Sequence, residues 1–196
     1  EIASCLVGSE MCIRDSTIAV LAVLLVLVIL VVVILCMIFG GGSWKTPINN
    51  VMDVLNDGDG KAYEELMPPY YKDMADALDG IVDISDEDYD EEAENQRDRL
   101  TKKYGDDAEI SYEVVKKTEV DSDDIDSYND MSDLASVLSA KKAKKYELKK
   151  AYKVKIKYTI EGEDADKTDK TTVIVGKMDG TWVLLDEGDL PISTGF

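Results

Sequence analysis

Clustered carboxylates are the residues with the most evident chemical potential in this chain, and the first group is Asp57-Gly58-Asp59-Gly60. Such spacing is typical of calcium loops, because Ca²⁺ takes carboxylate and carbonyl oxygens as ligands. Counted from Asp57, Lys61 occupies position five and Ala62 position six, where an EF-hand needs an oxygen ligand and a glycine. The pattern therefore predicts a turn between two helices, without a metal.

Two longer charged runs are explained by helix ends. Asp121–Asp130 contains five Asp, and the helix dipole stabilises acids in a first turn. Lys141–Lys150 is rich in Lys, as expected for a helix C-terminus that leads into a solvated strand. We therefore expect no cation site in the first run, and no surface for an anionic wall polymer or lipid in the second.

The residue types that are missing exclude much chemistry. The chain has no His, and its three Cys are Cys5, Cys12 and Cys36. The sequence after Cys36 therefore lacks a thiol nucleophile, a Ser-His triad, a structural zinc site and a disulfide. We predict no catalytic residue, no metal and no cofactor.

The charge balance bears on the partners. The chain has 41 Asp and Glu against 22 Lys and Arg, a net charge of −19. Nucleic-acid phosphates need a basic footprint, so we expect no nucleic acid as a partner. Tight docking on anionic lipid headgroups is disfavoured for the same reason. The acidic excess favours solubility in an exposed compartment, with a cation-binding surface as the alternative.

Three tyrosines remain as candidates for a ligand site: Tyr112, Tyr152 and Tyr158. Each lies in a segment of alternating polarity that predicts a strand, on the face expected to point inward. They are expected either to pack in the core with their hydroxyls at its rim or to line an apolar pocket.

An uninterrupted apolar run, IAVLAVLLVLVILVVVILCMIF, extends from Ile18 to Phe39 without a charge or a Pro. A helix of this length spans about 33 Å, enough to cross a hydrocarbon core of roughly 30 Å. We predict an uncleaved single-pass transmembrane helix at residues 17–39.

Two other fates of this run are weighed. A signal peptide has a shorter apolar core, yet Gly40 and Gly42 keep cleavage near Ser43 as an alternative. Lipoprotein processing at Cys36 is disfavoured, because Leu35 precedes it and the apolar run continues beyond it. Lys45 alone follows the run closely, in agreement with a domain that faces outward from the cell membrane.

The segment before the run resembles something other than protein-coding sequence. Residues 5–16, CLVGSEMCIRDS, look like the translated read-through of a transposase-type sequencing adapter in an assembled metagenomic gene. We therefore expect residues 1–16 to be an artefact, with native sequence resuming near Thr17 and an upstream part missing.

Four helices are predicted before the first strand. The first opens at Thr46-Pro47, where Thr caps free N–H groups and Pro fits the first turn. Apolar spacing and the breakers Pro68-Pro69, Asp79-Gly80 and Gly105 predict the others. They cover residues 62–67, 70–78 and about 85–103, the last behind a Ser85 capping box.

The second half of the chain is predicted to be mostly strand. We expect strands at 110–114, 152–160, 172–178 and 181–185, with one helix from Ser122 to Lys145 between the first two. Asp179-Gly180 predicts a hairpin with a two-residue turn. Helices followed by an antiparallel sheet predict the α+β class, with helices on one face.

The order of these elements resembles the nuclear transport factor 2-like (cystatin-like) superfamily. Residues 46–67, TPINNVMDVLNDGDGKAYEELM, are similar to its opening helix–turn–helix, and KMDGTWVLLD at 177–186 is similar to its closing hairpin. Residues 46–186 also resemble uncharacterised membrane-anchored or lipoprotein domains of Gram-positive anaerobes. The resemblance implies a sheet curled into a cone that can hold a pocket, although the helix after the first strand departs from the simplest pattern.

The predicted organisation is an artefact at 1–16, a transmembrane helix at 17–39, a linker at 40–45, an α+β domain at 46–190 and a tail at 191–196. We expect a non-catalytic extracytoplasmic binding or scaffolding domain for a cell-envelope component, a peptide or a membrane protein. Enzymes of the resembled superfamily use Asp, Tyr or His in the cone, so an isomerase-like or hydrolase-like enzyme is one alternative. An accessory stalk of a truncated membrane protein is another.

Overall fold

The computed structural model describes residues 42–78, 86–130 and 132–193. The predicted transmembrane helix, the adapter-like segment, Ser85 and the end of the predicted tail lie outside these residues. Within the described ranges, no helix combines the length and the apolar character needed to cross a membrane.

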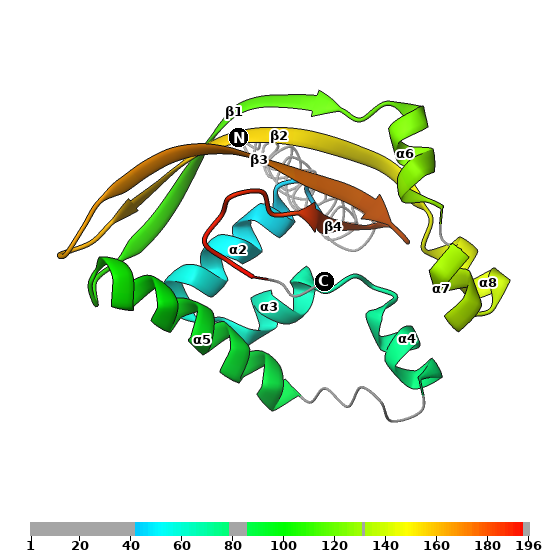
Figure 1. The fold of residues 1–196 in the computed structure, drawn as a ribbon, viewed down its shortest axis with the longest axis horizontal. Coiled ribbons are helices and arrows are strands. Elements are labelled where there is room, and N and C mark those ends of the chain that lie inside the picture. The colour runs from blue at the N-terminus through cyan, green and yellow to red at the C-terminus, as the bar shows by residue number, and fades with distance from the viewer. Residues whose placement is uncertain (1–41, 79–85, 131, 194–196) are drawn as a thin grey trace, which may run out of the picture. The chain divides into compact units, whose positions relative to one another are not determined.

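The described part is built from helices followed by an antiparallel sheet, as predicted (Figure 1). The helices before the sheet are α2 (Thr46–Asp57), α3 (Gly60–Leu66), α4 (Tyr71–Ala77) and α5 (Asp86–Tyr104). Strand β1 (Glu109–Glu119) is followed by α6 (Ser122–Tyr128), α7 (Ser132–Val137) and α8 (Ala140–Lys145). Strands β2 (Leu148–Glu161), β3 (Lys167–Met178) and β4 (Thr181–Asp186) complete the fold. The α+β class is therefore confirmed.

The four strands pair in the order β1-β2-β3-β4, each antiparallel to its neighbour. The predicted hairpin is confirmed, because Asp179 and Gly180 join β3 to β4 with φ angles of 45° and 84°. Two consecutive positive φ values define the turn whose twist matches that of the flanking strands. The strands β1 and β3 extend well beyond their predicted lengths.

Helix α2 packs directly against one face of the sheet, and α3 and α5 pack against α2. Figure 1 shows the long strands curled over α2, with α3 and α5 on the same side. Four inward residues of β2 are fully buried there, namely Val154, Ile156, Tyr158 and Ile160, while Tyr152 is partly buried. Trp182 lies in the same buried cluster as Val154, Ile156 and the α2 residues Val51, Met52, Val54 and Leu55.

The opposite, outward face is covered only at one end. Ala151, Gly176 and Val183 lie side by side in three neighbouring strands. Ala151 and Val183 belong to a second buried cluster, against which Ile125 of α6 packs. Ile174 of β3, opposite Lys153, is also buried on this face, and the positions further along β2 and β3 carry mostly polar side chains that solvent reaches.

The structure at the C-terminal end of α2 agrees with the prediction from the sequence, whereas that at its N-terminal end does not. Gly58 ends the helix with φ 65°, and the Asp59 carboxylate accepts a hydrogen bond from Ala62 N, so the acidic segment is a helix-connecting turn. Thr46 was expected to cap α2, and this was wrong. Lys45 is the cap residue, and the Thr46 hydroxyl accepts a hydrogen bond from Ser43 N instead.

The single helix predicted from Ser122 to Lys145 was also wrong, because three short helices replace it. Asn129 ends α6, and its side chain binds Leu148 twice, accepting from the backbone N–H at 2.7 Å and donating to the carbonyl at 2.9 Å. Ser139 then caps α8 by accepting from Lys142 N at 3.4 Å. Asn and Ser side chains compete with helical hydrogen bonds in this way.

We predict that Trp182→Ala destabilises the domain by about 3–5 kcal/mol, because truncating a buried aromatic removes apolar contacts and leaves a cavity. Thermal or chemical unfolding of the full chain, followed by circular dichroism, measures the change. Thr181→Ala is the matched control, since Thr181 is exposed in the same strand and should change stability by less than about 0.5 kcal/mol. Equal stability of both variants would mean that the closing strand packs differently.

Candidate functional site

Two of the candidate tyrosines, Tyr112 of β1 and Tyr158 of β2, lie opposite one another on the inward face of the sheet. Tyr158 is fully buried, accepts a hydrogen bond from Lys167 Nζ at 2.6 Å and donates one to the Asp189 carbonyl at 3.3 Å. The Tyr112 hydroxyl donates to Asn49 Oδ1 at 2.7 Å, and burial raises the pKa of that phenol. Both hydroxyls therefore join the sheet to neighbouring segments.

The third candidate, Tyr152, belongs to a different group. It lies six residues from Tyr158, about 20 Å along the strand. Its ring stacks on Trp182 with centroids 5.3 Å apart and meets Trp44 edge to face at 6.3 Å. The structure thus places the three candidate tyrosines in two separate groups.

Four lysines have their ammonium groups close to the aromatic side chains of Trp44, Tyr152 and Trp182. The Lys117 ammonium lies 4.2 Å from the Tyr152 ring centroid and 4.9 Å from that of Trp44. The other ammonium groups near these rings belong to Lys45, Lys150 and Lys177. Cation–π attraction of this kind stabilises the cluster modestly. Sequence reasoning missed the partnership of Trp44 and Lys117, which come from segments far apart in the chain.

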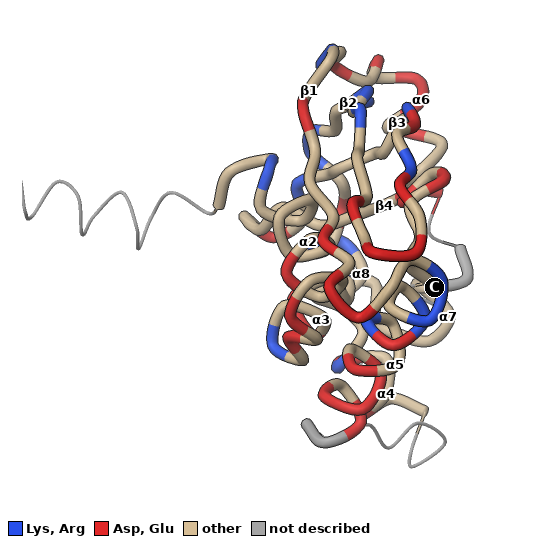
Figure 2. The backbone as a smooth tube through the Cα atoms, turned by 90° about the vertical axis from the view of Figure 1, so that its left-hand side faces the viewer, with Lys and Arg blue, Asp and Glu red and all other residues tan. Residues whose placement is uncertain are grey.

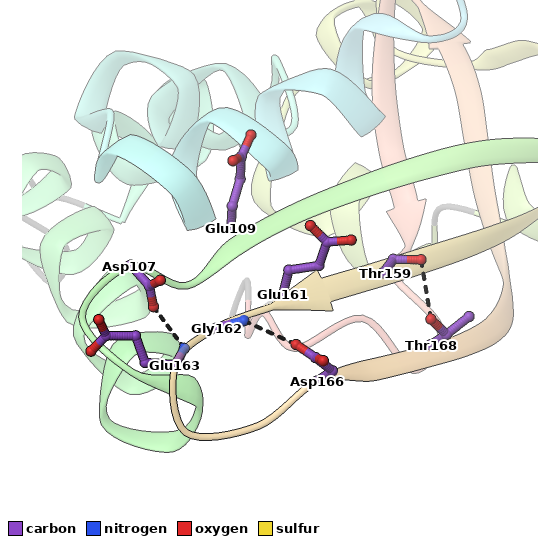
Figure 3. A pocket seen from close by; sticks show the side chains of 8 residues that line it. All are labelled: Asp107, Glu109, Thr159, Glu161, Gly162, Glu163, Asp166 and Thr168. Atoms are coloured by element: carbon purple, nitrogen blue, oxygen red, sulfur yellow. Dashed lines mark hydrogen bonds between the residues drawn. The ribbon is translucent and has the colours of Figure 1, made fainter.

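A pocket of about 560 Å³ opens at the opposite end of the sheet, near the β2–β3 connection (Figure 3). Its lining residues are Asp107, Glu109, Thr159, Glu161, Gly162, Glu163, Asp166 and Thr168. The lining is thus strongly acidic. No sequence signal pointed to it, because the residues come from two separate segments that pairing of β1 with β2 brings together.

Several polar groups of this pocket already hold the surrounding loops. Asp107 Oδ1 accepts a hydrogen bond from Glu163 N at 2.8 Å, and Asp166 Oδ1 accepts one from Gly162 N at 3.3 Å. The described residues contain no group of three or more acidic side chains, Cys or His placed to hold a metal ion. The pocket is therefore an acidic rim that stabilises its own turns, without the geometry of a cation site.

A different arrangement occupies the middle of the outward face. On β2, Lys153, Lys155 and Lys157 alternate with the buried residues and point outward. Lys116 of β1 lies directly opposite Lys155, and Lys170 of β3 lies directly opposite Lys157. We call these five residues the lysine band. Figure 2 shows Lys segments on β2 and β3 in a domain whose other surfaces carry many acids.

Two acids face the lysine band: Asp124 of α6, and Glu113 of β1, which lies directly opposite Lys157 but does not form an ion pair with it. Lys153 Nζ forms an ion pair with Asp124 Oδ2 of α6 at 2.8 Å. Within the described part of the chain, the other four lysines have no acidic partner within ion-pair distance. Sequence analysis missed Lys116 and Lys170, because the predicted first strand ended at residue 114 and the predicted third strand began at residue 172.

Asp169, whose pKa is lowered by the Lys170 backbone N–H and the Lys167 ammonium, adjoins the lysine band, whereas two other perturbed carboxyl groups, Asp73 and Asp53, belong to neither the pocket lining nor the band. The Tyr146 hydroxyl donates to Asp73 Oδ2 at 2.8 Å and, with Lys142 at 3.4 Å, holds the pKa of that carboxyl below its ordinary value. Partial burial, together with the carboxylates of Asp57 and Asp59, raises the pKa of Asp53. Neither group lines the acidic pocket near the β2–β3 connection.

Comparisons of the chain with protein-family models, with curated proteins and with solved structures found no match.

The contact between α4 and α8 gives a testable pH dependence. We predict that Tyr146→Phe raises the pKa of Asp73 towards its ordinary value, because the main hydrogen bond to the carboxylate is lost. Since the folded-state pKa is depressed, this bond stabilises the fold above the ordinary pKa of Asp. The stabilisation disappears as the pH falls through the folded-state value.

Carboxyl NMR titration of the wild type and the variant measures this change. The Asp169 carboxyl is the internal control, because the Lys170 backbone N–H and the Lys167 ammonium lower its pKa independently of Tyr146. An unchanged Asp73 titration in the variant would show that the hydrogen bond does not form in solution.

Proposed function

We propose that this protein is a single-pass membrane protein whose described domain is a non-catalytic binding module outside the cell. The main support is the filling of the inward sheet face, where a cone-like fold would hold a reactive pocket. The buried polar residues of the described ranges are Asn50, Gln96 and Thr171, none of which titrates near neutral pH. A proton-transfer enzyme needs a tuned acid or base at such a place.

The tyrosines on that face support the same proposal. Tyr158 is buried and its hydroxyl is already bonded to Lys167 and Asp189, so it fills the core. Tyr112 is bonded to Asn49. Side chains held in this way pack and orient the sheet, and they leave the exposed outward face as the surface available for a ligand.

Membrane anchoring is supported by the sequence around the start of the domain. The apolar run ends at Phe39, and Trp44 and Lys45 follow within six residues. Trp and Lys are favoured at the interface between hydrocarbon and water, where an amphipathic ring and a flexible cation both find suitable surroundings. A short covalent connection of this kind keeps the domain close to the headgroups.

We further propose that the domain is of the nuclear transport factor 2-like type. Support comes from the helices that precede a four-stranded antiparallel sheet, from the turn at Gly58-Asp59 and from the closing hairpin with Trp182. The helices α6, α7 and α8 between β1 and β2 are an addition to the simplest form of that fold.

The anchor is tested by expressing the full chain with a C-terminal tag. We predict full-length protein in the membrane fraction that resists carbonate extraction, because the run contains no charge to oppose insertion. The control variant L25K/V28K introduces two central charges, each costing about 2.5–3.5 kcal/mol of insertion free energy, and should become extractable. A soluble wild-type product starting near Ser43 would show cleavage and contradict the anchor.

The absence of catalysis is tested by titrating the carboxyl groups of the protein by NMR. We predict that no Asp or Glu inside a cavity titrates above about pH 6, a range in which tuned catalytic carboxyls are found. One such group would contradict the non-catalytic proposal and favour an isomerase-like enzyme. This measurement is independent of the anchor, so the two parts of the proposal can fail separately.

A further inference from the structure

We propose that the lysine band, formed by Lys116, Lys153, Lys155, Lys157 and Lys170, binds a linear polyanion that carries phosphate groups. This inference rests on the proposed binding function and names its ligand class and surface. The band lies on the outward face of β1, β2 and β3, and α6 adjoins it at the Lys153 end through the Asp124–Lys153 ion pair.

The placement of the lysines is unfavourable for the isolated fold. Lys116 and Lys155 are directly opposite each other, as are Lys157 and Lys170. Like charges at directly opposite positions of an antiparallel pair repel and destabilise the sheet. The chain has nearly twice as many acids as bases, yet it gathers unpaired bases here. A bound polyanion would remove this repulsion.

The geometry of the band fits an extended ligand. Alternate residues of one strand are about 6.6 Å apart, and neighbouring strands are about 4.8 Å apart. The four lysines without an acidic partner form a diagonal from Lys116 on β1, through Lys155 and Lys157 on β2, to Lys170 on β3. A chain with a charge at every unit can therefore contact several ammonium groups at once.

The neighbouring residue types favour phosphate over other anions. Lys is a compact point charge that binds phosphate without a fixed fork geometry. Hydroxyl groups of Thr118, Thr159, Thr168 and Thr172 lie on the same face, adjacent to the lysines in the register, and can donate to phosphate oxygens. No outward position of the described strands β1, β2 and β3 carries an aromatic residue for base stacking. The band is therefore suited to the phosphate groups of a chain and offers no surface for recognising nucleic-acid bases.

Acids at both ends limit the length of the surface. Asp124 binds Lys153 at the α6 end, and the acidic pocket around Glu109 and Glu161 lies at the other end of the strands. At physiological ionic strength, charges more than about 8 Å apart are largely screened. The polyanion therefore responds mainly to the lysine band itself. The acids at the two ends of the strands repel it there, so that it binds across the strands instead of along them.

Binding of end-labelled linear inorganic polyphosphate to the full chain, measured by fluorescence anisotropy, tests this inference. Nonionic detergent micelles keep the assay independent of whether the apolar run spans a bilayer. The test variant neutralises the four unpaired members of the band: K116Q/K155Q/K157Q/K170Q. The control variant removes the same charge from four exposed lysines elsewhere that also lack an ion pair within the described residues: K72Q/K141Q/K144Q/K149Q.

We expect the test variant to lose at least about tenfold in affinity and the control variant to lose less than about threefold. Each phosphate contact with a single-stranded polyanion contributes about −0.7 to the slope of log K against log salt. Removing four contacts should therefore make that slope shallower by about 3. The test variant should unfold no more easily than the wild type, because like charges have been removed.

Four results would overturn the inference. Equal losses in both variants would show binding through net charge alone. An unchanged affinity of the test variant would place the ligand on another surface, leaving the binding function intact. Failure of wild-type protein to bind would reject the phosphate polyanion, while carbonate extraction and carboxyl titration would still report on the anchor and on catalysis. Tighter binding of poly-L-glutamate than of polyphosphate would contradict the preference for phosphate.

Discussion

The alternation of side chains along β2 is the constraint on which the rest of this domain depends. Val154, Ile156 and Tyr158 point inward and are fully buried, while Lys153, Lys155 and Lys157 between them point outward. A slip of one residue would exchange the two sets and bury three ammonium groups. The same register that forms the core therefore creates the lysine band, and neither face can change without the other.

Local signals in the sequence were sufficient where neighbouring residues decide the structure. Asp179-Gly180 needs only its own backbone preferences to form a turn, and the Gly58-Asp59 junction joins a helix stop to a helix cap. The single helix predicted from Ser122 failed for the opposite reason. Asn129 ends α6 by binding Leu148, nineteen residues further along the chain, and no local preference reveals that partner.

The residues of the candidate sites also could not be assigned to a sheet face from local sequence alone. The register between β1 and β2 shifts between Val114 and Lys116, and this bulge changes which face the following residues occupy. Lys117 consequently lies opposite Val154 on the inward face, near the Tyr152 ring, whereas Lys116 lies opposite Lys155 on the outward face. Strict alternation from Ile110 would have assigned both lysines to the wrong face. Bulges redirect side chains in this way at sheet surfaces.

Net charge is an average, and the arrangement of charge on this fold limits what the average can exclude. A value of −19 argues against a polyanion only if acids and bases are evenly mixed over the surface. On the outward face they are not, because acids gather at the pocket around Glu161 while unpaired lysines gather four to six residues earlier on β2. Screening makes a ligand respond mainly to charges within about 8 Å. The composition argument therefore holds for ligands that wrap the whole domain, and it does not extend to a narrow chain that contacts the lysine band alone.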